Sequence, residues 1–259
     1  MPFGSLHMSN SFFRFKHFTI DQDKCAMKVT TDGCLFGAWL AAGCKHLAAH
    51  TPVNKSAAEV ATHVLDIGAG TGLLSLMYAQ LHQTHFIDAV ELDASAARQA
   101  KENVAGSPWP NAIHVQQQNI IYFKPGCKYD VIVSNPPFYE HYLKGSNTIK
   151  NTAHHSSHLS LELLFSNVNR LLKPNGLFFV LLPAYRTNEA LMLAQSFSLF
   201  PQKNTLVKQS PLHPFFRTML LFSREKTSVI PAKEIVIETQ RGQYSAAFIA
   251  LLQPYYLYL

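Results

Sequence analysis

Four consecutive residues, Asn135-Pro136-Pro137-Phe138, offer groups that can together hold a planar amine or amide nitrogen. They directly follow an apolar run at 131–134. The Asn135 side-chain oxygen and the Pro136 carbonyl can accept both hydrogens of an exocyclic amine, which favours a more nucleophilic nitrogen and stabilises the charge that develops on it. The prolines fix the backbone and remove competing donors, and the Phe138 ring can stack on a base. On its own, the tetrapeptide is equally consistent with an ordinary turn.

A glycine-rich segment lies upstream, where residues 66–72 read DIGAGTG. Glycines permit a tight turn and let a ligand approach the backbone. A dinucleotide-binding loop would continue with glycine or alanine, but this chain has Leu73, so NAD or FAD is disfavoured. About 20 residues further on, Glu91 stands where an acid is expected to bind ribose hydroxyls. The alternative is a glycine turn that binds nothing.

Alternating strands and helices position these segments. We expect strands at 63–67, 86–92, 113–117, 131–134 and 177–182, and helices at 72–82, 94–104 and 159–172. This alternation predicts an α/β fold, a Rossmann-like and mostly parallel seven-stranded sheet with an antiparallel closing strand and helices on both faces. The first and fourth strands should be neighbours, so the two loops would face each other at the carboxyl edge of the sheet.

Both ends of the chain add to this core. Residues 11–31 are predicted to be extended, followed by a helix at 32–49 and a loop at 51–56. Pro174-Asn175-Gly176 are expected to end the helix at 159–172 before the fifth strand begins. After it we expect a helix at 188–200, an antiparallel pair at 204–209 and 218–223, a strand at 234–238 and a helix at 245–252.

The glycine loop, the acid and the order of elements resemble those of class I S-adenosylmethionine-dependent methyltransferases. The resemblance implies that S-adenosyl-L-methionine is the cofactor, and that Asp66, Gly68 and Gly70 line its methionine end. It also implies that Glu91 binds the ribose and that Asn119, after the third strand, lies beside the adenine.

The tetrapeptide at 135–138 resembles the loop of methyltransferases that act on amine or amide nitrogens. That group includes enzymes for adenine N6 in DNA and RNA, guanine N2 in ribosomal RNA and glutamine N5 in release factors. The resemblance implies catalytic roles for Asn135, Pro136 and Phe138 and gives the class of reaction, without the substrate.

The N-terminal stretch is similar to the signature of the bacterial tRNA adenine-N6 methyltransferases, through FKHFTI at 15–20, CAMKVTTDG at 25–33 and GAW at 37–39. The similarity extends over most of the chain, to the tail at 244–259. It implies methylation of an adenine in tRNA, with adenosine 37 beside the anticodon of valine tRNA as the family's known target.

That resemblance also implies that Lys28, Thr31 and Asp32 border the cofactor and the target pocket. Asp32 is equally suited to cap the helix that begins there. The chain departs from the family pattern at Thr30, where a glycine is expected, and at Cys34 and Phe36, where smaller or aliphatic residues are usual; the 135–138 loop is unaffected.

A tRNA partner fits the aromatic and basic leader, because cationic side chains contact phosphates and aromatic rings stack on bases. The candidate RNA-binding residues are Arg14, Lys16, Lys24, Lys144, Lys150 and Arg217. The alternative for the phenylalanines of the leader, such as Phe13 and Phe15, is packing in the core.

Composition sets outer limits on these interpretations. The 259 residues, 47% hydrophobic and 15% charged, suit one compact globular domain. Within it we distinguish residues 1–9 as a tag or disordered leader, 10–59 as an N-terminal extension and 60–259 as the methyltransferase core. The net charge of +6 favours a polyanionic partner. No apolar run is long enough to cross a membrane, and neither a signal peptide nor disulfides are expected, so we predict a cytoplasmic protein.

Three histidines, at positions 154, 155 and 158, have no acidic or cysteine partner at ligand spacing, and we expect no metal. The loop at 139–157 is expected to close over the substrate. Alternatives that stay open are guanine-N2 or glutamine-N5 methylation and a non-catalytic cofactor-binding RNA module. A monomer is favoured, but the sequence leaves the oligomeric state, the modified nucleotide and the RNA-binding surface open.

Overall fold

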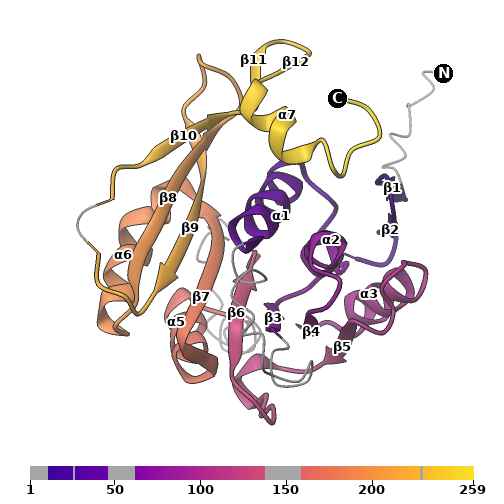
Figure 1. Ribbon diagram of the computed structural model, residues 1–259, viewed down its shortest axis with the longest axis vertical. Coiled ribbons are helices and arrows are strands. Elements are labelled where there is room, and N and C mark those ends of the chain that lie inside the picture. The colour runs from indigo at the N-terminus through magenta and orange to yellow at the C-terminus, as the bar shows by residue number, and fades with distance from the viewer. Residues whose placement is uncertain (1–10, 26, 46–61, 138–158, 228–229) are drawn as a thin grey trace, which may run out of the picture.

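The computed structural model describes residues 11–25, 27–45, 62–137, 159–227 and 230–259, and a large central sheet dominates it (Figure 1). Its eight strands run in the order β10-β8-β9-β7-β6-β3-β4-β5. The strands are β3 (His63–Ile67), β4 (Phe86–Glu91), β5 (Ile113–Gln117), β6 (Tyr129–Ser134), β7 (Leu172–Pro183), β8 (Phe200–Lys208), β9 (Phe215–Ser223) and β10 (Lys233–Val236).

The pairing confirms the predicted architecture. Strands β5, β4, β3, β6 and β7 are parallel, and β9 is antiparallel to both β7 and β8. The expected first and fourth strands, β3 and β6, are direct neighbours, with Val64 opposite Val131. The sheet has eight strands rather than seven because the short strand expected at 234–238 joins the edge, where β10 pairs in parallel with β8.

Helices cover both faces of the sheet, as expected. They are α1 (Thr31–Gly43), α2 (Leu73–Leu81), α3 (Ala94–Ala105), α5 (Leu161–Leu171), α6 (Thr187–Ser196) and α7 (Ala246–Leu252), with 3-10 turns η2 (Ile120–Tyr122) and η3 (Ala184–Arg186). Successive strand residues point to opposite faces. Val64 therefore joins the core under α1, α2, α3 and α7, while Leu65 joins the core under α5 and α6.

Some predicted boundaries were wrong. The helix expected at 188–200 ends at Ser196, and Ser198, with a left-handed φ of 55°, turns the chain into β8. The helix expected at 159–172 ends at Leu171, and residues 174–176, which were expected to end it, lie inside β7, where the ladder with β6 shifts register. In the described residues, α1 ends at Gly43. Three predictions lie wholly or partly outside the described residues: the leader at 1–9, the end of the helix at 32–49 and the loop at 51–56.

The leader and the tail are built onto the core. Strands β1 (Phe12–Arg14) and β2 (Thr19–Asp21) form a hairpin. The rings of Phe15 and Phe18 stack at 4.5 Å and are 2% and 5% exposed, so their role is packing rather than base stacking. A second small hairpin, β11 (Glu238–Gln240) and β12 (Gln243–Tyr244), precedes α7. Among the described residues, no helix is long and apolar enough to cross a membrane.

Candidate active site

The glycine loop between β3 and α2 has the conformation of a ligand cradle. Gly68, Gly70 and Gly72 take φ values of 74°, 56° and 83°, which side chains other than glycine rarely adopt. A Cβ built on Gly68 or Gly70 meets no atom within 4 Å, so open space lies over the loop. The loop therefore fits a ligand such as S-adenosylmethionine that lies directly against the backbone.

Asp66 supports this loop from beneath. It is fully buried, its Oδ2 accepts from the Ser75 hydroxyl at 2.8 Å, and its Oδ1 has no hydrogen-bond partner among the described residues. Burial raises the pKa of this carboxyl to about 7, opposed by the Ser75 bond. The structure thus places Asp66 under the loop with one unpaired oxygen among the described residues, and its predicted place beside the methionine end of the cofactor stays a prediction.

Glu91, at the end of β4, closes the other side of the cradle. Its Oε2 accepts from the Gly70 amide and its Oε1 from the Asp93 amide, both at 2.8 Å. The Gly68 amide donates to the Val90 carbonyl, also at 2.8 Å. Each carboxylate oxygen keeps further acceptor capacity, so Glu91 can still bind ribose hydroxyls while it holds the loop.

Beyond β5, the expected adenine region is partly apolar. Asn119 lies two residues after the end of β5 and caps η2, where its side chain accepts from the Ile121 amide at 2.9 Å. Two exposed apolar side chains stand at the same edge, Leu92 at 46% and Ile121 at 41%. Leu92 was not predicted from the sequence as a site residue. Its position directly after Glu91 could have indicated an apolar surface for the adenine ring of the cofactor.

The leader packs on α3, and we call its described residues 21–25 and 27–30 the strap. On α3, Asn103 donates its amide hydrogens to the carbonyls of Asp21 and Thr71, each at 2.9 Å. Burial raises the pKa of the Cys25 thiol, and the nearby Glu91 carboxylate acts in the same direction. The Lys28 ammonium donates to the Gln22 carbonyl. The strap therefore brings Lys28 into the neighbourhood of the cofactor loop.

The 135–137 segment leaves β6 beside the end of β3 and the first turns of α1 and α2. The buried Ser134 hydroxyl donates to the Ile67 carbonyl at 2.8 Å, which joins the ends of β6 and β3. A Cβ built on Gly33 lies 3.8 Å from the Asn135 amide nitrogen and 3.6 Å from Leu73. The first turn of α1, the start of α2 and Asn135 thus converge.

Two predicted site residues turn out to be partners of each other. Asp32 Oδ2 accepts from Arg217 Nε at 2.6 Å, and the side chains are 13% and 27% exposed. Asp32 is not the helix cap; Thr30 is, because its hydroxyl accepts from the Gly33 amide. The extended residue before the helix can turn its side chain onto that amide, whereas Asp32 already lies in the first turn. Thr31 begins α1 beside them.

The basic residues of the leader point elsewhere. Lys16 donates to the Gln253 carbonyl at 2.6 Å, and Lys24 pairs with Glu102 at 2.8 Å. Arg14 lies 6.0 Å from the Phe12 ring. The structure therefore ties Lys16 to the C-terminal tail and Lys24 to the C-terminal end of α3. Neither of these partners is near Asn135 in the sheet order.

Several predictions fall outside the described residues. They concern Phe138, Lys144, Lys150, the histidines 154, 155 and 158, and the closing loop at 139–157. Within the described part of the chain, no group of three histidine, cysteine or acidic side chains could hold a metal ion.

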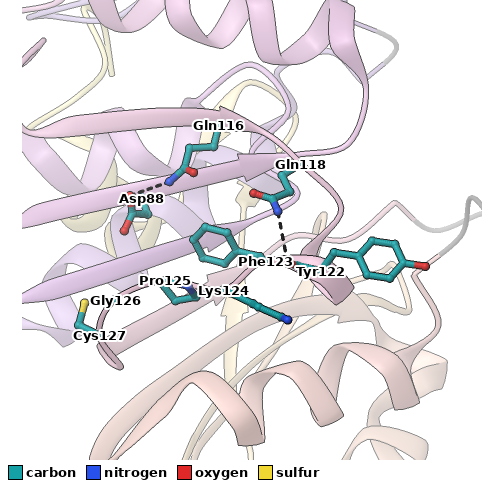
Figure 2. Close-up of a pocket in the computed structure, with 9 residues that line it drawn as sticks. All are labelled: Asp88, Gln116, Gln118, Tyr122, Phe123, Lys124, Pro125, Gly126 and Cys127. Carbon is teal, nitrogen blue, oxygen red and sulfur yellow. Dashed lines mark hydrogen bonds between the residues drawn. The ribbon is translucent and has the colours of Figure 1, made fainter.

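Figure 2 shows a pocket of about 350 Å³ that is separate from this site. Asp88 lies in it and accepts from the Gln116 amide at 3.1 Å and from the Tyr129 hydroxyl at 2.7 Å. The remaining lining comes from Gln118 and residues 122–127, which follow β5 in place of a long helix. None of the lining residues belongs to the glycine loop or to the 135–137 segment.

Comparisons with known proteins agree with this geometry. The profile of the methyltransferase small domain matches residues 27–204. A protein of Bacteroides fragilis (strain ATCC 25285) named tRNA1(Val) (adenine(37)-N6)-methyltransferase is 41% identical over 253 residues, which cover 96% of this chain and 99% of the relative. Proteins of the same name from Parabacteroides distasonis and Pectobacterium carotovorum are 36% and 37% identical, covering 96% and 99% of this chain and 99% and 98% of the relatives.

Solved structures share the fold. A predicted O-methyltransferase from Agrobacterium tumefaciens, protein Atu636, superposes with a TM-score of 0.60 at 12% identity, covering 86% of this chain and 95% of its own. The CcbJ methyltransferase from Streptomyces caelestis superposes with a TM-score of 0.51 at 14% identity, covering 76% and 96%.

Proposed function

Because the chain belongs to the methyltransferase small domain family, and to the group of its near full-length relatives, we propose that it methylates N6 of adenosine 37 in tRNA1(Val). S-adenosyl-L-methionine is the methyl donor. The proposal draws its substrate from the relatives' shared name and its chemistry from the site.

The observation that carries the proposal is the pairing of β3 with β6. The glycine cradle follows β3 at Gly68, and the acceptor segment follows β6 at Asn135, so both leave the same edge from adjacent strands. The Ser134–Ile67 bond fixes their ends together. A cofactor in the cradle and a base held by Asn135 would therefore meet at short range, as direct transfer between them requires.

The cofactor supplies an electrophilic methyl group when bound, and the chain holds and orients it. Gly68 and Gly70 leave room for it against the backbone, and Glu91 presents acceptor oxygens for its ribose. Leu92 and Ile121 offer apolar surface to its adenine, with Asn119 beside them.

The acceptor nitrogen is held by oxygen atoms rather than by a titrating base. The Asn135 amide oxygen and the Pro136 carbonyl would each accept one N6 hydrogen, which stabilises the positive charge that develops on the nitrogen. Phe138 would stack on the flipped adenine. Gly33 lies against the Asn135 amide nitrogen, which suits an orientation with the amide oxygen turned toward the substrate.

The relatives' name favours adenine over the other acceptors of this loop type, guanine N2 and glutamine N5. A non-catalytic RNA module would not need Asn135. We further propose that the extension at 10–59 and the core at 60–259 act as one compact domain, since Asn103 of α3 bonds both the Asp21 carbonyl of the strap and the Thr71 carbonyl of the glycine loop. A tRNA substrate places the reaction in the cytoplasm, and a monomer remains a prediction.

The test is transfer of tritiated methyl groups from S-adenosylmethionine to total tRNA from a strain that lacks the gene, followed by nucleoside analysis. We expect label in N6-methyladenosine, and primer extension or mass spectrometry of purified tRNA1(Val) should locate it at position 37. N2-methylguanosine instead, or no label in any tRNA, would refute the proposal.

A further inference from the structure

One side of the acceptor segment is bounded by strands that continue beyond it. β6 ends at Ser134, which pairs with Val180, whereas β7 continues to Pro183, paired with Arg217 of β9. Three further residues rise about 10 Å along a strand. Because β7 neighbours β6 and β9 neighbours β7 in the sheet (Figure 1), the two strands form a wall beside Asn135.

The top of this wall carries aromatic and cationic side chains. From here on, the wall means Tyr185 of η3 together with residues 208–217, which form the end of β8, the following turn and the beginning of β9. Tyr185 is 67% exposed, and Leu212, in the turn, is 95% exposed. Cations lie beside its other rings. The Lys208 ammonium lies 5.0 Å from the Phe215 ring, and the Arg217 guanidinium lies 5.3 Å from the Phe216 ring.

Ion pairs hold the cations of the wall in place. Lys208 pairs with Glu234 at 3.1 Å, and Arg217 pairs with Asp32 at 2.6 Å. The Asp32 bond also ties the wall to the first turn of α1, whose Gly33 abuts Asn135. The wall is therefore fixed relative to the acceptor segment, as a surface that positions a substrate must be.

Flat faces next to cations suit single-stranded nucleic acid. Base stacking on aromatic side chains tolerates any base, and cations above rings add to the attraction. An adenine that is taken out of its stack leaves neighbouring nucleotides that need new contacts. The wall stands next to the residue that would hold this adenine, on the side away from the cofactor cradle.

Building on the proposed function, we propose that the wall binds the nucleotides that flank the target adenosine in the anticodon loop, with Tyr185 stacked on a flanking base. The cofactor half of the same edge offers a matched control. Tyr122 of η2, beyond β5, is 69% exposed and is separated from β7 by β4, β3 and β6.

The test measures binding and turnover separately on the full chain. Binding of a fluorescent, unmodified valine anticodon stem-loop is followed by anisotropy, and methylation of tRNA1(Val) by label incorporation. We expect Tyr185→Ala to weaken RNA binding about 10-fold, since one stacked base is lost, and Tyr185→Phe to retain it. Tyr122→Ala should change RNA binding less than about twofold, and the cofactor Kd should be unchanged in all variants.

A second pair of variants tests the turn. Leu212→Glu places a negative charge in the turn and should weaken RNA binding several-fold, whereas Met192→Glu, on α6 at 68% exposure, should not. Equal effects of Tyr185→Ala and Tyr122→Ala, or unchanged RNA binding in both Tyr185→Ala and Leu212→Glu, would overturn the inference. RNA binding that depends on Tyr185 without any methylation by the wild type would refute the proposed function and leave the wall intact.

Discussion

Burial of Asp66 under the glycine loop makes the stability of the cofactor-free protein depend on pH. Its pKa is about 7 in the folded protein against an ordinary 3.8. Between these values the folded state keeps a proton that the unfolded state releases, so raising the pH favours unfolding. The gap corresponds to about 4 kcal/mol in the free energy of unfolding, of which more than half falls between pH 5 and pH 8.

Asp66→Asn removes this titration while it keeps the size of the side chain and an acceptor for the Ser75 hydroxyl. Urea unfolding of the cofactor-free wild type and variant, followed by circular dichroism from pH 5 to pH 8, gives the difference between them. We expect the unfolding free energy of the variant to rise by about 2–3 kcal/mol relative to the wild type across this range. Using the difference cancels the other titrating groups, which both proteins share.

The control is Glu162→Gln, which removes an exposed carboxyl from the first turn of α5. It reports the effect of the same carboxyl-to-amide change away from the glycine loop. If the stability curves of Asp66→Asn and the wild type run parallel, the Asp66 carboxyl does not titrate in this window, and burial beneath the loop does not act as argued.

Further predictions concern stability and turnover. Burial lowers the pKa of His85 to about 4, so below pH 6.5 the unfolded state binds a proton that the folded state does not. The wild type should therefore lose up to about 3 kcal/mol of unfolding free energy as the pH falls to 4, and His85→Gln should remove this loss in the same urea series. Asn135→Ala should lower kcat more than about 100-fold with the calorimetric Kd of S-adenosylmethionine unchanged, and loss of both would mean that the loop is structural. Gly37→Ala, whose Cβ would lie 2.6 Å from Met77 Sδ, should cost about 1–3 kcal/mol of unfolding free energy. Its control Gly126→Ala, whose Cβ would have no atom within 4 Å, should cost less than about 0.5 kcal/mol, and equal urea midpoints for the two variants would contradict the packing argument.

The cofactor half of the site could be predicted from the sequence because its residues lie close together along the chain. The glycine loop and Glu91 belong to one strand–helix–strand unit, and each glycine has a positive φ that the residue type itself signals. The pairing of β3 with β6 followed from the order of strands in such sheets. The burial of Asp66 was not readable, since it depends on how Ser75 and the loop pack around it.

Long-range pairings account for the rest of what the sequence missed. Arg217 was predicted as an RNA contact and Asp32 as a cofactor contact or a cap. The cap was wrong, and the sequence did not reveal that the two side chains bond to each other across 185 residues. Lys24 was likewise predicted to face RNA, and it pairs with Glu102 on α3. A charge on one strand does not reveal which opposite charge the fold brings to it, so single cations were the weakest part of the sequence interpretation.

This difference between local and long-range features has a consequence for substrate choice. The glycine loop, Glu91 and Asn135, which are proposed to hold the methyl donor and the acceptor nitrogen, come from the ends of β3, β4 and β6. Methylation of any acceptor by this type of loop needs these groups. The proposed RNA contacts come from η3 and the β8–β9 turn, which are tied to the site through β7 and the Asp32–Arg217 pair. The wall can therefore change without disturbing the cradle or Asn135. We accordingly expect proteins with the same 135–138 loop and a different acceptor to keep the cradle and to differ at positions 185 and 208–217.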